Sequence, residues 1–403
     1  MTMSGSVVYL LSDVLGGVTS IISNLLRYRK QDQFRYDVVL MRYVGQSVDH
    51  PNPERLLADS LRAVTFDGMD NVEKVLQYVH EAIPAGEGVA VSNEGLGLAA
   101  LTRYNSGRAV FHILHNDSND CYEMAKRYDH VVDGFITYAR LMYEKSQQFL
   151  PHRRDTIFYL PYGVPIPQER RTASDGPIRL LFAARLIREK GIYELPGIDE
   201  ALLARGVRAS WTVVGSGPGG DEVRGEWRNA SVRWTGALPN NEVLRLCQEH
   251  DIFVFPTTFP EGLPVALLEA MAAGVVPVAT NLPGGLQEAV QHGLSGYLHP
   301  PSDIDGFAAS IASLHRDRAK LDSMSMAARR RVQEEFDIQK RVLGYQNLFA
   351  RWRELRRPRS GHVAISYGSR LDKKWMPNCV VRIARKIRQR RTPIISGMQG
   401  AEQ

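Results

Sequence analysis

Residues 259–280 read FPEGLPVALLEAMAAGVVPVAT, and this stretch decides the fold that the sequence predicts. Its first half predicts a short apolar helix, because Pro264 suits the first turn of a helix and nearly all the following residues are apolar. Its second half, VVPVAT at 275–280, predicts a buried strand. Apolar strands that alternate with helices are typical of parallel sheets covered by helices on both faces.

Runs of the same kind occur along the chain in two series. The first series comprises SVVYLLSD (6–13), YDVVLMRY (36–43), AVTFDG (63–68), GVAVSN (88–93), AVFHILHN (109–116), GFITYA (134–139) and TIFYLPYG (156–163). The second comprises IRLLFAA (178–184), SWTVVG (210–215), SVRWTG (231–236), DIFVFPT (251–257), VVPVAT (275–280) and SGYLHP (295–300). Three prolines and a polar run at 164–177 predict a linker between them. The sequence therefore predicts an α/β fold with two doubly wound Rossmann-like domains, at 1–167 and 178–337.

The composition of the chain excludes several classes of protein. With 403 residues, 44% hydrophobic and 23% charged, the chain is too long for one core and too apolar for wholesale disorder. Its cysteines, Cys121, Cys247 and Cys379, are too far apart for a zinc knuckle or a disulfide framework, which favours a reducing, cytoplasmic setting. The first residues have no basic region before the apolar run, so we expect no signal peptide, and no stretch has the pattern of a membrane span.

The positive charge is concentrated at the end of the chain. Residues 1–355 have a formal charge of −4, whereas the tail at 356–403 has 12 basic residues against two acidic ones and a charge of +10. Within the tail, VVRIARKIRQRR at 380–391 predicts a basic amphipathic helix. Such a helix suits an anionic membrane surface, although a solvated tail fits the same pattern. Because residues 1–355 are slightly acidic, we expect no nucleic-acid partner.

Ligands of open α/β sheets bind beyond the carboxyl ends of the strands, so the residues that follow each strand are the candidates for a site. Gly16 and Gly17 follow the first strand and begin an apolar helix, where their amides can approach a phosphate. Arg185 and Lys190 follow the strand at 178–184 and can hold a diphosphate. The loop at 216–220, with Gly217, can pass close to a ligand. Taken singly, each is equally compatible with a turn or a surface charge.

Glu261 and Glu269, which bracket seven residues, give the strongest signal. Glu269 is the single charged residue between Pro264 and Ala279. A carboxylate on so apolar a helix requires solvent, a cation or a ligand, because unpaired burial of charge costs several kcal/mol or shifts the pKa strongly. Two ribose hydroxyls could donate hydrogen bonds to the Glu269 carboxylate. Alternatively, the side chain could face solvent on a half-buried helix.

Taken together, these motifs resemble retaining glycosyltransferases of the two-Rossmann (GT-B) type in glycosyltransferase family 4. The resemblance extends from the first strand to about Leu355 and rests on the two glutamates in EGLPVALLE followed by AMAAGVVPVAT. Supporting matches are the Gly16-Gly17 loop, His115-Asn116, YLPYGVP, AARLIREKG, VVGSGPGG, WTGAL and LPGGLQEAVQHGLSGYLHP. The resemblance implies that the two domains face each other across a cleft and that the helix at 338–355 crosses back to the first domain.

The resemblance also implies roles for particular residues. Glu269 would hold the ribose hydroxyls of a UDP- or GDP-sugar, while Glu261 and the residues after it, Gly262, Leu263, Pro264 and Val265, would bind the donor sugar. Arg185, Lys190 and Gly17 would hold the diphosphate, with Gly16 and Gly217 beside it, and the base would lie near Leu238. His115 would contact the donor sugar close to the bond that breaks. Tyr162 stands where relatives commonly have Asn, and Asp13-Val-Leu precedes the Gly pair, so the hinge and acceptor contacts depart from the family pattern.

The expected reaction needs no resident cofactor and no metal. The cations of Arg185 and Lys190, together with helix N-termini, can neutralise a departing diphosphate. Asp303 and Asp305 have the spacing of a manganese motif from another fold, but they precede a helical pattern and are interpreted as N-terminal caps. His115 ends an apolar strand, where a structural histidine is common, and His112 offers the same chemistry two residues earlier.

Two further hypotheses remain open from the sequence. A sugar-nucleotide epimerase shares this fold but needs an acid and a base rather than the Glu261/Glu269 pair. A non-catalytic scaffold would keep the fold and use the basic tail to sit on a membrane. The expected acceptor of the transferase is a saccharide or a lipid-linked sugar, in envelope polysaccharide or glycolipid assembly, at the cytoplasmic face of a membrane.

Overall fold

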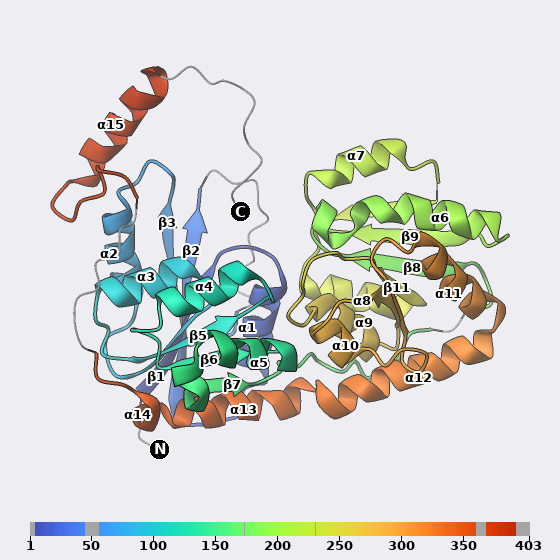
Figure 1. Ribbon diagram of the computed structural model, residues 1–403, viewed down its shortest axis with the longest axis horizontal. Coiled ribbons are helices and arrows are strands. Elements are labelled where there is room, and N and C mark those ends of the chain that lie inside the picture. The colour runs from blue at the N-terminus through green and yellow to red at the C-terminus, as the bar shows by residue number, and fades with distance from the viewer. Residues whose placement is uncertain (1–4, 45–55, 173, 230, 360–367, 392–403) are drawn as a thin grey trace.

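The computed structural model describes residues 5–44, 56–172, 174–229, 231–359 and 368–391 (Figure 1). The other positions of the two predicted domains, the linker and the basic tail lie outside the described residues. The described chain forms two α/β domains side by side, each built on one parallel sheet and joined along one side by long C-terminal helices.

The first domain contains a seven-stranded parallel sheet in the order β3-β2-β1-β4-β5-β6-β7. Its strands are β1 (Gly5–Ser12), β2 (Phe34–Tyr43), β3 (Ser60–Phe66), β4 (Gly88–Ser92), β5 (Ala109–Leu114), β6 (Gly134–Thr137) and β7 (Ile157–Tyr159). Its helices are α1 (Gly17–Tyr28), α2 (Val72–Ala82), α3 (Gly95–Arg103), α4 (Asn119–Arg127) and α5 (Arg140–Phe149), followed by the 3-10 helix η2 (Pro151–Thr156).

The second domain contains a six-stranded parallel sheet in the order β10-β9-β8-β11-β12-β13. Its strands are β8 (Ile178–Ala183), β9 (Ala209–Val214), β10 (Val232–Gly236), β11 (Ile252–Phe255), β12 (Val276–Thr280) and β13 (Tyr297–His299). Its helices are η3 (Arg188–Lys190), η4 (Ile192–Glu194), α6 (Leu195–Ala204), α7 (Gly219–Glu226), α8 (Asn240–Glu249), α9 (Val265–Ala272), α10 (Gly285–Ala289), α11 (Ile304–Arg316) and α12 (Arg318–Glu335).

All thirteen predicted strands form, because both faces of each sheet are covered. Every residue of β4, β5, β6, β11 and β12 is buried. This is why these strands lack the polar alternation of a sheet with one face in water. The predicted fold class, two doubly wound α/β domains, is confirmed.

Two segments connect the domains and lie side by side. The amide of Val164 donates to the carbonyl of Phe336 (2.8 Å), and the amide of Ile338 donates back to Val164 (3.2 Å). A Cβ added to Gly163 would lie 2.5 Å from the Cα of Ile338, so the close approach requires glycine. This crossing sets the position of one domain against the other.

The C-terminal helices continue from this crossing onto the first domain. α13 (Ile338–Ala350) packs on α1, and the short α14 (Trp352–Leu355) contacts β4 and β5. The continuous helix predicted over 338–355 is therefore wrong in one detail, because Arg351 leaves helical geometry and caps α13. α15 (Asn378–Arg391) lies beyond, beside α2 and β3 (Figure 1).

The predicted linker does more than join the domains. Arg171 is buried and its guanidinium bonds the carboxylate of Asp251 (2.6 Å), while the backbone amide of Arg171 donates to Ala273 and that of Thr172 to Gln248. These contacts attach the segment to the second domain. No helix in the described residues is both long and apolar enough to span a bilayer.

Candidate functional site

The carboxyl edges of the two sheets meet, and the predicted site residues line this junction. The loop that joins β11 to α9 contacts the end of β5: Asn116 forms an antiparallel bridge with Glu261, and the amide of Asp117 donates to Pro260 (3.1 Å). A Cβ added to Gly262 would lie 2.4 Å from the carbonyl oxygen of His115. Residues almost 150 positions apart in the sequence are therefore in direct contact.

The glycine pair after β1 lies at the same junction. Gly16 and Gly17 are exposed, and Gly17 is the first residue of α1. A Cβ on Gly17 would lie 3.3 Å from a methyl group of Val265, the first residue of α9. The N-termini of α1 and α9, one from each domain, thus face the same space, where their amides and dipoles favour an anion.

The two predicted cations follow β8. Arg185 is exposed directly beyond the strand, whereas Lys190 ends η3 and its ammonium forms an ion pair with Glu261. Gly217, with a φ of 150°, places the loop after β9 against Leu186: an added Cβ would lie 2.6 Å from the carbonyl oxygen of Leu186. This contact supports the loop that carries Arg185.

Glu261 is held from two sides. Its Oε1 accepts hydrogen bonds from the Lys190 ammonium and from the Thr257 hydroxyl (3.3 Å). The side chain of Glu261 is 12% exposed and that of Lys190 14%. The pair is therefore a half-buried ion pair at the junction, and an incoming anion would compete with the carboxylate for Lys190.

Glu269 is buried in the middle of α9, 2% exposed, and its Oε1 accepts a hydrogen bond from the side-chain amide of Asn240 (2.7 Å). Burial raises the pKa of Glu269 to about 7, and the bond from Asn240 partly offsets this. Asn240 begins α8, two residues after the half-buried Leu238. The sequence predicted Glu269 and Leu238 but not Asn240, because the contact depends on how α8 packs on α9.

His115 lies just beyond β5, and its Nε2 is 3.0 Å from Oδ1 of Asn93. Since the Asn93 amide nitrogen donates to Leu10, Oδ1 is the acceptor and Nε2 donates, which leaves Nδ1 of His115 as an acceptor. This Nδ1 is buried and has no hydrogen-bond partner in the described chain. Burial, with a smaller effect of His112, lowers the pKa of His115 to about 3, so the ring is neutral at pH 7.

The structure separates His115 from its neighbour. His112 is 2% exposed inside β5, and its Nδ1 lies 3.0 Å from the carbonyl oxygen of Ser92. Burial lowers the pKa of His112 to about 4. His112 is thus a core residue, whereas His115 lies at the strand end beside the junction.

Glu94, which the sequence did not single out, follows β4 at the same edge. One carboxylate oxygen of Glu94 accepts a hydrogen bond from the Ser12 hydroxyl, and the other is buried without a partner among the residues described. Burial raises the pKa of Glu94. The signal was present in the sequence, because Ser92-Asn93-Glu94 places polar residues directly after an apolar strand.

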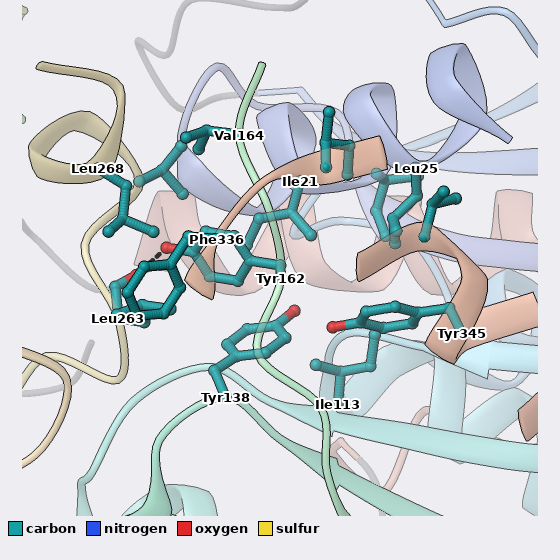
Figure 2. Close-up of a cluster of buried hydrophobic side chains, with 14 of the residues drawn as sticks. Ile21, Leu25, Ile113, Tyr138, Tyr162, Val164, Leu263, Leu268, Phe336 and Tyr345 are labelled. Carbon is teal, nitrogen blue, oxygen red and sulfur yellow. Dashed lines mark hydrogen bonds between the residues drawn. The ribbon is translucent and has the colours of Figure 1, made fainter. Parts of the chain in front are cut away.

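Tyr162, a departure from the family pattern, joins the domains. Its hydroxyl donates to the carbonyl of Leu263, between Glu261 and Glu269, and its ring packs edge-on against Tyr138 with centroids 4.8 Å apart (Figure 2). Leu263 itself is buried, and Pro264 caps α9 rather than lying within its first turn. The tyrosine therefore holds the backbone of the loop that carries the predicted donor residues.

The two aspartates with the spacing of a metal motif have other partners. Asp303 caps α11 by accepting a hydrogen bond from the Gly306 amide (2.9 Å), which confirms that prediction. Asp305 forms an ion pair with Arg205 and lies in the first turn of the same helix. Among the residues that the structure describes, no group of three or more His, Cys, Asp and Glu side chains could hold a metal ion.

Comparison with known proteins finds a family match in the second half of the chain. Residues 167–331, less than half of the chain, match the family model described as Glycosyl transferases group 1. The segment is therefore similar to this family. The chain is 32% identical over 180 residues to the amylovoran biosynthesis glycosyltransferase AmsK of Erwinia amylovora, an alignment of 41% of this chain and 43% of that protein. It is also 32% identical over 221 residues to the glycogen synthase of Mycobacterium tuberculosis, 51% of each chain.

The chain thus spans about half or less of the curated relatives it matches, whereas solved structures match across both domains. HepE of Anabaena, in complex with UDP and glucose, superposes with a TM-score of 0.66 at 18% identity, over 85% of this chain and 99% of that one. Sucrose-phosphate synthase of Thermosynechococcus elongatus gives a TM-score of 0.66 at 19% identity, over 86% and 98%. These similarities show the GT-B architecture of two facing domains.

The matched segment contains most of the predicted site residues. They are Arg185, Lys190, Gly217, Leu238, Glu261, Gly262, Leu263, Pro264, Val265 and Glu269. Gly16, Gly17 and His115 lie outside the matched segment, in the first domain. Gly17 and His115 approach the matched segment at Val265 and Gly262, and Gly16 precedes Gly17 in the chain.

Proposed function

We propose that this chain is a retaining glycosyltransferase of family 4 that moves a sugar from a UDP- or GDP-sugar to a saccharide or lipid-linked acceptor. The observation that carries the proposal is the junction itself: Gly17 faces Val265 and His115 faces Gly262, so the predicted donor residues of two domains line one space. Relatives described as biosynthesis glycosyltransferases of amylovoran and colanic acid support a role in polysaccharide assembly. Our proposal extends this role to envelope polysaccharide or glycolipid assembly at the cytoplasmic face of a membrane.

In this proposal Glu269 binds the ribose. A carboxylate accepts hydrogen bonds from two neighbouring hydroxyls, and Asn240 already occupies one of its oxygens, Oε1. The base would lie against the backbone near Leu238, next to Asn240 in the chain. Binding of hydroxyls to the ionised form would lower the pKa of Glu269 from its raised value.

The leaving diphosphate would be stabilised by cations and backbone amides. As the bond from the sugar C1 to the phosphate oxygen breaks, negative charge grows on the phosphate and positive charge on the sugar ring. Arg185, Lys190 and the amides at Gly17 offer fixed positive charge to that phosphate. Lys190 would move from Glu261 to the phosphate, which leaves Glu261 free to accept hydroxyls of the donor sugar. These groups supply the neutralisation that a metal would give, so we assign no metal and no resident cofactor to the step.

Retention would follow from attack on the face from which the diphosphate leaves. The acceptor oxygen forms the new bond to C1, and its proton passes to the departing phosphate oxygen. His115 would orient the donor sugar through Nδ1, which can accept a hydrogen bond from a hydroxyl. Because the ring is neutral, it would act by position rather than by donating a proton.

Thermal-shift measurements with UDP, GDP, ADP and their common sugar conjugates, with and without EDTA, test the donor side. We expect stabilisation by one nucleotide, unaffected by EDTA and lost in Glu269→Ala. Glu200→Ala is the matched control, because Glu200 is exposed on α6 of the same domain. Absence of a shift with every nucleotide would favour the scaffold hypothesis.

Product analysis tests the reaction. With the identified donor and a saccharide acceptor, we expect multiple turnovers and a product whose anomeric configuration matches the donor, read by proton NMR. Inverted configuration would overturn the retaining mechanism, and epimerised donor without transfer would favour the epimerase hypothesis.

A further inference from the structure

α15 is docked on the first domain with its apolar side chains facing outward. Val380, Ile383 and Ile387 are 48%, 60% and 49% exposed, and their spacing places them along one stripe of the helix. Trp375, just before the helix, is 77% exposed. A helix that packs on a water-soluble domain normally turns such residues toward the core, so this orientation is the reverse of the usual one.

The inner side of the helix is held by charges instead. Arg382 bonds Asp67 (2.9 Å) and Asp70 (2.6 Å), and Arg385 bonds Asp372 (2.6 Å) and backbone carbonyls at Gly68 and Asp70. The buried Val381 is the apolar contact on this side.

Backbone and amide contacts fix the segment that leads into α15. The Asn71 side chain donates to the carbonyls of Lys373 (2.9 Å) and Met376 (2.8 Å), and the Asn378 side chain accepts from the Asn71 amide (2.7 Å). Trp375 lies within this bound segment yet points into solvent. The exposure of the apolar stripe is therefore set by specific contacts and not by a loosely attached helix.

The exposed surface around the apolar stripe is basic. Lys373, Lys374, Lys386 and Arg388 are exposed beside it. The acidic residues nearby, Asp67, Asp70 and Asp372, are paired with Arg382 and Arg385 and so do not cancel this charge. An exposed tryptophan, an aliphatic stripe and flanking cations together match the interface of a bilayer with anionic headgroups.

We infer that Trp375, Val380, Ile383 and Ile387 form a docking surface for an anionic lipid bilayer, with Arg382 and Arg385 fixing α15 to the domain. The positive charge of the surface favours an anionic bilayer over a second copy of the chain. Two copies would bring the same four cations together, and like charges repel. The apolar side chains would enter the headgroup region while the flanking lysines contact phosphates.

The place of α15 in the fold gives the docking a consequence for the reaction. Asp67 and Asp70 directly follow β3, so α15 sits at the carboxyl edge of the first sheet, the edge that also carries Gly17, Glu94 and His115. A bilayer held there would present a lipid-linked acceptor at the sheet edge that carries the proposed site. This consequence rests on the proposed function, whereas the docking itself does not.

Co-sedimentation of the full chain with vesicles tests the docking. We expect binding to vesicles of phosphatidylcholine with 30% phosphatidylglycerol to exceed binding to pure phosphatidylcholine, and to fall about tenfold or more when Val380, Ile383 and Ile387 are all changed to Ser, since three apolar contacts are lost. Leu203→Ser with Met326→Ser is the matched control, because these residues are 50% and 48% exposed on the second domain. The control should bind as the wild type does.

A second variant tests the charge. Replacing Lys373, Lys374 and Lys386 by Gln should weaken binding and reduce its dependence on salt, while circular dichroism and the response to nucleotide stay unchanged. Equal vesicle binding by the wild type and the Ser variant would overturn the inference. So would failure of the wild type to bind, or a dimer, seen by light scattering, that the Ser variant dissolves.

The same set of proteins separates this inference from the proposed function. Absence of vesicle binding by the wild type, with an intact nucleotide response, would overturn the docking alone. Vesicle binding without any nucleotide response would remove the transferase and leave the docking.

Discussion

The two sheet edges that meet at the junction differ in how their polar groups are satisfied. On the second domain Lys190 is paired with Glu261 and Glu269 with Asn240, and Arg185 is exposed. On the first domain the Nδ1 of His115 and one oxygen of Glu94 are buried without partners among the described residues. One edge is charged, and the other holds unsatisfied hydrogen-bonding atoms in a low-dielectric setting.

This difference indicates a division of labour. Fixed cations suit the diphosphate, which carries charge before and after the bond breaks. Buried acceptors without partners suit hydroxyl groups, which gain most where water is absent. We therefore expect variants of the second edge to affect both donor binding and turnover, and variants of the first edge to affect turnover with little change in donor binding.

The largest effect is expected for Lys190→Ala. Removing a cation from the diphosphate should lower kcat/KM about 10³-fold, because the charge on the leaving group grows in the transition state. Steady-state kinetics with the identified donor measures this. Arg208→Ala, an exposed cation at the amino end of β9, is the control, and an equal loss in both variants would contradict the assignment.

His115→Ala should lower kcat about 10²-fold with little change in donor affinity, since the lost hydrogen bond would act on the reacting sugar. Because the pKa of His115 is about 3, the wild-type rate should show no titration near pH 6.5 from this residue. His152→Ala, an exposed histidine of the same domain, should keep the wild-type rate. Full turnover by His115→Ala would remove His115 from the reaction.

A smaller effect concerns pH. The pKa of Glu269 is raised to about 7, so the carboxylate that we propose as the ribose ligand is present above pH 7 and is lost below it. Nucleotide affinity should therefore fall about tenfold between pH 8 and pH 6, as expected one unit below the pKa. Isothermal titration calorimetry measures the change. Glu269→Gln should bind weakly at both pH values, and a wild type with flat affinity would contradict the role.

The raised pKa of the Glu269 carboxyl group also makes the stability of the folded protein depend on pH when no nucleotide is bound. A carboxyl group whose pKa is raised on folding favours the folded state at low pH, and this contribution is lost as the pH rises from about 4.5 to about 7. The melting temperature of Glu269→Gln should therefore fall less than that of the wild type across this interval.

The smallest effect is expected for Gly17→Ala, which tests the close approach of α1 to α9. A Cβ at position 17 would lie 3.3 Å from Val265, so Gly17→Ala should cost about threefold in kcat/KM through a slight displacement of α1 from α9. Val265→Ala in the same chain should restore most of the loss. Failure of this rescue would show that Gly17 acts through its own backbone rather than through its approach to α9.

Local pattern was sufficient for the strands and for the donor loop. Runs such as AVFHILHN and VVPVAT are so apolar that only a buried strand accommodates them, and Glu269 stands out because its neighbours are all apolar. The partners of these residues were not predictable. Asn240 reaches Glu269 from another helix, and Tyr162 reaches Leu263 from the other domain. Such contacts depend on packing between distant segments, which no short window contains.

The tail shows the same limit. The spacing of Val380, Ile383 and Ile387 predicted an amphipathic helix, and the helix forms. Its orientation was not encoded locally, because Arg382 and Arg385 face inward through Asp67, Asp70 and Asp372. A charged inner side and an apolar outer side are the opposite of what hydrophobicity alone would give.

The sequence by itself determined the two α/β units and their strands, and it supplied candidates for the donor residues, since each depends on periodicity or on residues close together in the chain. Tertiary structure alone decided which groups became partners: Lys190 with Glu261, Asn240 with Glu269, Gly17 with Val265, and α15 with the end of β3. Local sequence fixes what a segment can bury, whereas the free energy of long-range packing selects its neighbours.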